Sequence, residues 1–224
     1  SSFTMNEAKT VTANFVIKSF TLSVTATNGS VTKLPDADSF DSGTVVTLTA
    51  VPAAGYQFIG WDGDLTGTTN PTSIKMSAKK SVTAKFAIKT YALSISATNG
   101  TVTKSPNATT YDSGTVVTLT AVPAAGYQFT GWSGGLTGTT NPSSVTMSAA
   151  KSVTANFALK TFALSISATN GTVTKSPNAT TYDSGTVVTL TAVPGAGYQF
   201  TGWDGDLTGT TNPASVKMEK DRSV

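Results

Sequence analysis

One stretch of this sequence recurs at a fixed interval along the chain. Trp61, Trp132 and Trp203 are separated by 71 residues each time. The same offset superimposes three prolines and three methionines, which are Pro52, Pro123, Pro194, Met76, Met147 and Met218. A fixed period of this kind means that the chain is built from copies of one structural unit. We place the copies at residues 20–86, 91–157 and 162–224.

Both ends of the sequence fall inside a copy of the unit. Residues 5–15, MNEAKTVTANF, match residues 76–86, MSAKKSVTAKF, and the third copy stops at Val224, the equivalent of Val153. We therefore expect the chain to be a piece of a longer protein. Residues 1–15 are predicted to be the C-terminal strand of a preceding copy, and the third copy is predicted to lack its last strand end. The residues of this segment that could complete another sheet are Val11, Ala13 and Phe15.

Apolar and polar residues alternate within each copy. In the second copy Leu93, Ile95 and Ala97 share one side of a period-two pattern, and no segment has an apolar period of 3.6 residues over three turns. The pattern predicts an all-β or β-rich fold with about five to seven strands per copy. We expect a tandem array of small antiparallel β modules, each β-grasp-like or a small β-sandwich. The four-residue linkers lack the Gly and Ser of a flexible hinge, which favours an elongated rod.

Two hairpins are predicted in each copy. Asn99-Gly100 has the composition of a two-residue hairpin turn that needs positive φ, and the other copies repeat it. A second hairpin is predicted around Ser148–Lys151, with Val145 on one arm and Val153 on the other.

Composition and motif content exclude several classes of function. The chain has no Cys or His, 12% charged residues and a formal net charge of +3. It has no nucleophile elbow, no phosphate loop and no pair of carboxylates common to all three copies, so we predict that it is not an enzyme and needs no cofactor. Its lysines are scattered rather than clustered, which excludes nucleic acid as a partner. No run reaches the roughly 18 apolar residues of a membrane span.

The run GYQFTGW, followed after a loop by MSAAKSVTANF, resembles a bacterial repeat family named after the B repeats of internalins, in its divergent form. The residues that carry the resemblance are Gly126, Tyr127, Phe129, Gly131, Trp132, Met147, Lys151, Val153, Ala155 and Phe157. The other copies keep the same order, so the resemblance covers essentially the whole chain. It implies a surface-exposed repeat of secreted or cell-wall-associated bacterial proteins, a β-grasp-like sheet and no catalytic residues.

Pairs of aspartates are the candidates for a metal site. Asp62 and Asp64 in the first copy, and Asp204 and Asp206 in the third, have the spacing found at the front of a calcium loop. The second copy has Ser133 and Gly135 instead, and no glutamate follows at the twelfth position. We therefore interpret the stretch as an Asp-Gly turn and predict no metal.

Aromatic residues recur at three positions of each copy. They are Tyr56, Phe58, Trp61, Tyr127, Phe129, Trp132, Tyr198, Phe200 and Trp203. We interpret them as structural core, because a small module without disulfides needs this apolar mass inside. The alternative is a stacking platform for a sugar, which requires exposed rings.

The predicted function is that of a non-catalytic stalk or adhesive spacer in an extracellular protein, secreted or at the bacterial cell surface. One alternative is the subunit of an extracellular filament that assembles head to tail by β-strand complementation. Another is a carbohydrate-binding repeat array. The expected partners are neighbouring repeats, further copies of the chain, or a host or matrix protein or glycan.

Overall fold

Seven strands form the first repeat in the computed structural model, which describes residue 2 and residues 4–224. They are β1 (Ser19–Ala26), β2 (Gly29–Leu34), β3 (Ser39–Asp41), β4 (Val45–Pro52), β5 (Tyr56–Gly63), β6 (Thr72–Lys75) and β7 (Lys80–Ile88). Side chains alternate between the two faces of each strand. In β4, for example, Val46, Leu48 and Ala50 are buried, whereas Val45 and Val51 are exposed.

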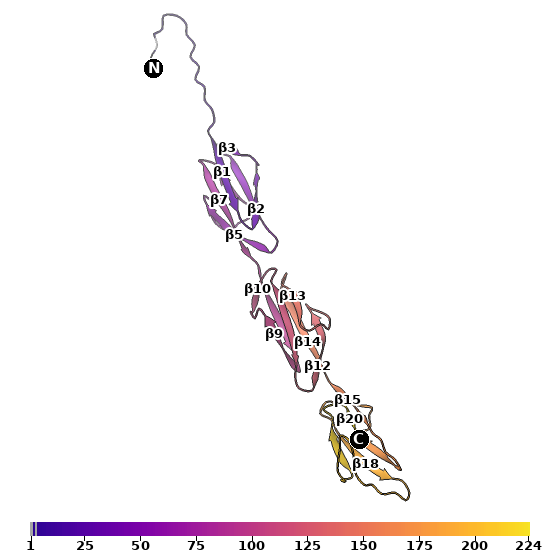
Figure 1. The fold of residues 1–224 in the computed structure, drawn as a ribbon. Helices are drawn as coiled ribbons and strands as arrows, with labels where there is room; N and C mark the ends of the chain where they lie inside the picture. The colour runs from indigo at the N-terminus through magenta and orange to yellow at the C-terminus, as the bar shows by residue number, and fades with distance from the viewer. Residues whose placement is uncertain (1, 3) are drawn as a thin grey trace. The chain divides into compact units, whose positions relative to one another are not determined.

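The strands of this repeat form a sandwich of two sheets (Figure 1). One sheet has the order β3-β1-β7-β5 and the other has the order β2-β4-β6. All neighbouring strands are antiparallel except β1 and β7, the first and last of the repeat, which are parallel. The described residues contain no helix, so the all-β prediction is confirmed. Of the two modules considered, the observed one is the β-sandwich.

Every connection in the repeat passes from one sheet to the other, and the two predicted hairpins are therefore wrong. Asn28-Gly29 connects β1 with β2, which lie in different sheets, and the same holds for β6 and β7. Asn28 has the positive φ of 66° that the turn requires. A turn of this kind suits a corner between two sheets as well as a hairpin, and the burial of one apolar face against the other selects the corner.

The second repeat has the same architecture. Its strands are β8 (Thr90–Ala97), β9 (Gly100–Ser105), β10 (Thr110–Asp112), β11 (Val116–Pro123), β12 (Tyr127–Gly134), β13 (Ser143–Thr146) and β14 (Lys151–Leu159). They form sheets in the orders β10-β8-β14-β12 and β13-β11-β9. The parallel pair here is β8 with β14.

The third repeat has shorter sheets. Its strands are β15 (Thr161–Ser165), β16 (Gly171–Ser176), β17 (Thr181–Asp183), β18 (Val187–Pro194), β19 (Ala214–Lys217) and β20 (Arg222–Ser223). The sheets have the orders β17-β15-β20 and β16-β18-β19. The segment that corresponds to β5 and β12, around Phe200, forms no strand, because β20 offers it only a short neighbour.

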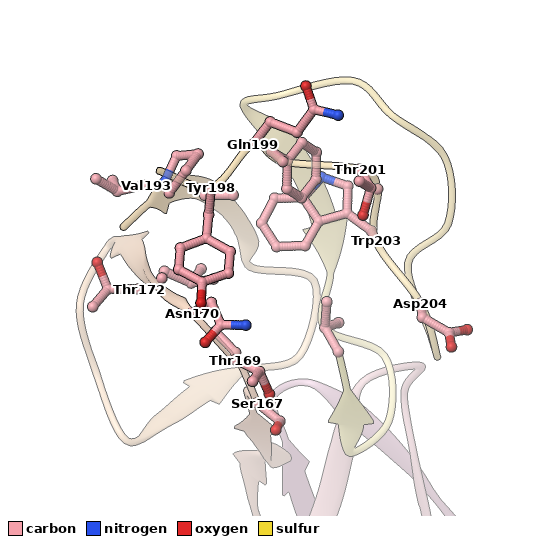
Figure 2. Close-up of a pocket in the computed structure, with 18 residues that line it drawn as sticks. Ser167, Thr169, Asn170, Thr172, Val193, Tyr198, Gln199, Thr201, Trp203 and Asp204 are labelled. Carbon is pink, nitrogen blue, oxygen red and sulfur yellow. The ribbon is translucent and has the colours of Figure 1, made fainter. Parts of the chain in front are cut away.

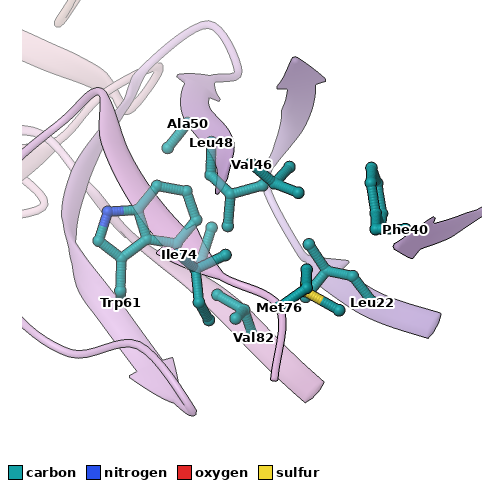
Figure 3. Packing of buried hydrophobic residues seen from close by; sticks show 10 residues of the cluster. Leu22, Phe40, Val46, Leu48, Ala50, Trp61, Ile74, Met76 and Val82 are labelled. Carbon is teal, nitrogen blue, oxygen red and sulfur yellow. The ribbon is translucent and has the colours of Figure 1, made fainter. Parts of the chain in front are cut away.

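Each repeat encloses its own hydrophobic core between the sheets, as Figure 3 shows for the first repeat. Val46, Leu48, Met76 and Val82 are completely buried there. Burying a side chain of this size contributes about 1.5–3 kcal/mol relative to leaving it in water. Met76 lies just after β6, so its burial anchors the connection between β6 and β7 to the core.

The N-terminal segment lies outside these cores. Residues 4–18 belong to no strand, and the side chains of Val11 and Phe15 are 71% and 91% exposed. Ala13 is exposed as well. Residues 1 and 3 of the predicted segment 1–15 lie outside the described residues.

Candidate functional site

The recurring tryptophan lies in the core of each repeat. Trp61 is 5% exposed, and its indole Nε1 donates a hydrogen bond to the carbonyl oxygen of Thr69 at 2.9 Å. Its backbone amide donates to the carbonyl oxygen of Gly67 at 2.8 Å. Because Trp61 is buried in the core and binds two carbonyl groups of the loop that follows β5, it holds this loop against the core.

One phenylalanine packs against the indole ring, and a second packs against the first. The ring centroids of Phe58 and Trp61 are 5.1 Å apart, and those of Phe58 and Phe86 are 5.8 Å apart in an edge-on contact. Phe129 and Trp132 repeat the first of these contacts in the second repeat. A sugar platform needs an open ring face, which these tryptophans do not offer.

A β-bulge allows both aromatic residues of this strand to face inward. Phe58 and Trp61 are three positions apart, so a regular period of two would place them on opposite faces. The register of β5 against β7 shifts between Phe58 and Gly60, and Gly60 has a φ of 151°. The extra residue, Ile59, is 48% exposed. The invariant Gly before the Trp in all three copies is the sequence signal of this bulge.

The tyrosines lie at the edge of the aromatic cluster. Tyr56 and Tyr127 are half-buried, whereas Tyr198 is 58% exposed. Phe200 and Trp203 retain their contact, with ring centroids 5.0 Å apart, and Trp203 is 9% exposed. The third repeat therefore keeps the contact between Phe200 and Trp203 and leaves Tyr198 exposed to solvent.

The aspartates of the first repeat bind protein groups. Asp62 contacts the Nζ of Lys85 and accepts a hydrogen bond from the amide of Gly63 at 2.9 Å. Asp64 accepts one from the amide of Ser81 at 2.7 Å. Together these contacts attach the end of β5 and the turn after it to the neighbouring strand β7.

In the other two repeats the corresponding turn is attached to the neighbouring strand by different contacts. In the second repeat the amide of Gly135 donates to the carbonyl oxygen of Ser152, and Asn156 donates to the hydroxyl of Ser133 at 3.1 Å. In the third repeat Asp206 binds the amide of Ser223 and the Nζ of Lys220, and Asp204 binds the amide of Gly205. No group of three His, Cys, Asp or Glu side chains that could hold a metal occurs in the described part of the chain.

These contacts lower the pKa values of two carboxyl groups in the turn. The hydrogen bond from Lys85, with that from the Gly63 amide, lowers the pKa of Asp62. The hydrogen bonds from Lys220 and from the Ser223 amide lower the pKa of Asp206. Both groups are therefore stabilised as carboxylates in the folded protein.

The sequence analysis missed an asparagine that pairs with a strand. The side chain of Asn70 accepts a hydrogen bond from the amide of Ala50 and donates one to its carbonyl oxygen, both at 2.8 Å. It thus takes the place of a neighbouring strand beside β4, two residues before the start of β6. Asn141 and Asn212 make the same pair of bonds. The recurring sequence Asn-Pro was its only signal.

A buried tyrosine was missed as well. Tyr111 is 4% exposed, and its hydroxyl accepts a hydrogen bond from the amide of Ala108 at 3.1 Å and lies 3.0 Å from the carbonyl oxygen of Pro106. Lys104 crosses the same ring, with its Nζ 5.9 Å from the centroid. The first repeat has Phe40 at this position and lacks the hydroxyl.

The family model that matches this chain is that of the divergent InlB B-repeat domain, and it matches residues 20–90, 91–161 and 162–224. It describes a repeat of bacterial surface proteins, and it is not a known family of enzymes. No curated protein matches the chain. In the part of the chain that the structure describes, no helix is long and apolar enough to cross a membrane. By the match of all three copies, the chain belongs to the divergent InlB B-repeat family.

Proposed function

We propose that this chain is a non-catalytic stalk segment of a secreted or surface-attached bacterial protein, which holds another domain at a distance. The observation that supports it is the parallel pairing of β1 with β7. Because the first and last strands run in the same direction, the chain enters a repeat at one end and leaves at the other. Successive copies therefore add length, whereas an antiparallel pair would return the chain to its starting end.

The short connection between repeats fits this role. Only Lys89 separates β7 from β8, and only Lys160 separates β14 from β15. A connection of one residue leaves little freedom compared with a Gly/Ser linker. The outer face of the β9-β11-β13 sheet is rich in hydroxyl groups and carries little charge, as at Thr103, Thr118 and Ser144. Adhesion through such faces is a secondary role in this proposal.

Small-angle X-ray scattering tests the stalk. The chain is compared with a variant in which residues 91–161 are duplicated. The expected result is a larger maximum dimension in the variant, by roughly the 27 Å length of an eight-residue strand. An unchanged maximum dimension would contradict the proposal. A variant with a second copy of residues 20–90 in place of the duplicated 91–161 serves as the control, because it should lengthen the molecule equally.

A groove in the third repeat supports a second candidate, assembly of copies by strand complementation. The groove has a volume of about 410 Å³ and is lined by the end of β18, the Asn170-Gly171 corner and the segment from Tyr198 to Asp204. Figure 2 shows Tyr198, Asn170 and Trp203 around this space. In the second repeat the last part of β14 occupies the equivalent position, where Ala155 pairs with Trp132 and Phe157 pairs with Phe129.

The N-terminal segment has the sequence that fits this groove. Residues 11–18 read VTANFVIK, and residues 153–160 at the end of β14 read VTANFALK. Val11 corresponds to Val224, so residues 12–17 of a second copy would continue from the point where β20 ends. Phe15 would then lie against Gly171 and Phe200. If the third repeat continued past Val224 with the sequence found at the end of β14, those residues would occupy the same groove.

Light scattering over a concentration series tests this assembly. The chain is expected to exceed its monomer mass of 22.8 kDa as its concentration rises. Phe15→Asp should prevent this, whereas Asn14→Lys should not, because the corresponding Lys85 contacts Asp62 and the third repeat has Asp204 at the position of Asp62. Adding Thr-Ala-Asn-Phe-Ala-Leu-Lys after Val224 should also prevent it. A monomer at all concentrations, or assembly that persists in Phe15→Asp, would exclude strand complementation.

A further inference from the structure

The first and last strands of the second repeat form a continuous parallel ladder. Residues Lys151–Ala155 of β14 pair with Leu93–Ala97 of β8 over five consecutive positions. In the first repeat, residues Leu22–Ala26 of β1 pair with residues Lys80–Ala84 of β7, again over five positions. The hydroxyl groups of Thr25 and Thr83 add a side-chain hydrogen bond of 2.8 Å across this ladder.

One neighbouring strand and the core support the ladder. On the outer side of β14, β12 pairs with Val153–Ala155. On the outer side of the other ladder strand the neighbour is short: in the first repeat β3 pairs with Ser19–Thr21, which precede the ladder residues Leu22–Ala26. On the inward face, Leu93, Val153 and Ala155 are buried in the core. The backbone hydrogen bonds of the ladder are therefore covered by β12 along the β14 edge and by the opposite sheet on one face.

Tension along the chain would act on this ladder in a particular direction. The chain enters the repeat at the start of β8 and leaves it at the end of β14, and the two strands are parallel. Pulling on the two ends therefore slides one strand along the other. In this shear geometry all the hydrogen bonds of the ladder carry the force together. In an antiparallel hairpin pulled at its open end they would instead break one after another.

We propose that the parallel ladder between the first and last strands is a mechanical clamp, which makes each complete repeat resistant to tension along the chain. The inference rests on the proposed stalk function, since a stalk transmits force between what it holds and the surface. It adds that the resistance resides in the ladder and depends on the direction of pulling. Forced unfolding is governed by the rate of unfolding, so the clamp acts on the kinetic barrier.

The third repeat provides an internal comparison. Its ladder between β15 and β20 consists of two paired positions, Leu164 with Arg222 and Ser165 with Ser223. Val188, Leu190 and Met218 are completely buried in its core, as their equivalents are in the other repeats, but the segment around Phe200 forms no strand. Under tension this repeat should therefore open first, at a lower force than the two complete repeats.

Single-molecule pulling can separate the direction of force from the stability of the repeat. The chain contains no Cys, so pairs of introduced Cys residues define the two attachment points. One variant carries Ala92→Cys, just before the ladder in β8, and Ala158→Cys, beyond its other end in β14, and is pulled in shear. The matched variant carries Ala92→Cys and Ser152→Cys, at the same end, and is pulled so that the strands peel apart. All three positions are exposed, and the two variants share one attachment point.

The expected result is a rupture force several-fold higher for the shear pair than for the peeling pair, with equal unfolding midpoints in denaturant. Equal rupture forces in the two directions would overturn the clamp. A chain pulled at its two ends should show one weak event, from the third repeat, before two strong ones. Three events of equal force would also overturn it. The stalk proposal is tested separately, because the scattering measurement applies no force.

Discussion

The ring of Phe157 lies against Gly100 so closely that no side chain fits between them. A Cβ atom on Gly100 would lie 2.6 Å from Cζ of Phe157 and 2.7 Å from the carbonyl oxygen of Val122. Gly100 begins β9 in one sheet, and Phe157 belongs to β14 in the other. The glycine of the Asn-Gly corner is therefore required because the two sheets approach each other closely there.

Gly100→Ala is expected to destabilise the second repeat by about 1–3 kcal/mol, the usual cost of overpacking a filled site. The φ of Gly100 lies outside the left-handed region, so backbone strain does not add to this cost. Hydrogen exchange of peptides from the second repeat would measure the change. In a double variant with Phe157→Leu the two effects should not add, because the smaller side chain relieves part of the overlap. Full additivity would show that the ring is not what restricts this position.

Asn141→Ala is expected to destabilise the second repeat by about 1–3 kcal/mol, because it leaves the amide and carbonyl groups of Ala121 without partners. Asn141→Asp should restore only part of the stability, since a carboxylate accepts from the amide but cannot donate to the carbonyl oxygen. The exposed Asn107→Ala is the control and should have little effect. Equal stabilities of Asn107→Ala and Asn141→Ala would contradict the role assigned to Asn141.

The difference between Phe40 and Tyr111 predicts two reciprocal effects. Tyr111→Phe should lower the unfolding free energy of the second repeat by about 0.5–1.5 kcal/mol. The substitution removes the buried hydroxyl that accepts a hydrogen bond from one backbone group and donates one to another. Phe40→Tyr should raise the unfolding free energy of the first repeat by a smaller amount. Chemical denaturation followed by hydrogen exchange in each repeat would measure both. A neutral Tyr111→Phe would mean that water satisfies the same groups.

The aspartates of the turn after β5 predict a difference in acid sensitivity between repeats. In the folded protein the pKa values of Asp62 and Asp206 lie below that of an unfolded Asp, which is about 3.9. A lowered pKa contributes stability that is fully present above the unfolded value and is lost as the pH falls through the folded one. The first and third repeats should therefore lose this contribution below about pH 4.

The second repeat is the internal control for acid sensitivity, because it has Ser133 and Gly135 at these positions. Hydrogen exchange of the three repeats at pH 7 and pH 3, corrected for the intrinsic exchange rates, would compare them in one sample. Asp62→Asn should remove the sensitivity that arises from Asp62. An equal loss in all three repeats would place the acid-sensitive groups elsewhere.

Part of the candidate site could be predicted from local sequence and part could not. The recurring Trp, Phe and Tyr were recognisable as a cluster, but the bulge at Gly60 that turns Phe58 and Trp61 to the same face depends on the register between β5 and β7. The asparagine that pairs with Ala50 bonds to a residue 20 positions away. Such a partner has no signature in the sequence around either residue.

The sequence by itself determined that the protein consists of tandem copies of one β module. Both the 71-residue period and the period-two alternation can be recognised along the chain without knowing which strands pair. Which strands pair was decided only by the tertiary structure. The Asn-Gly corners are compatible with a hairpin, yet each one carries the chain into the opposite sheet. The physical reason is that each sheet has one apolar face, and both faces are buried only when the two sheets cover each other. The parallel pairing of β1 with β7, and with it the opposite placement of the two ends of each repeat, is likewise visible only in the tertiary structure.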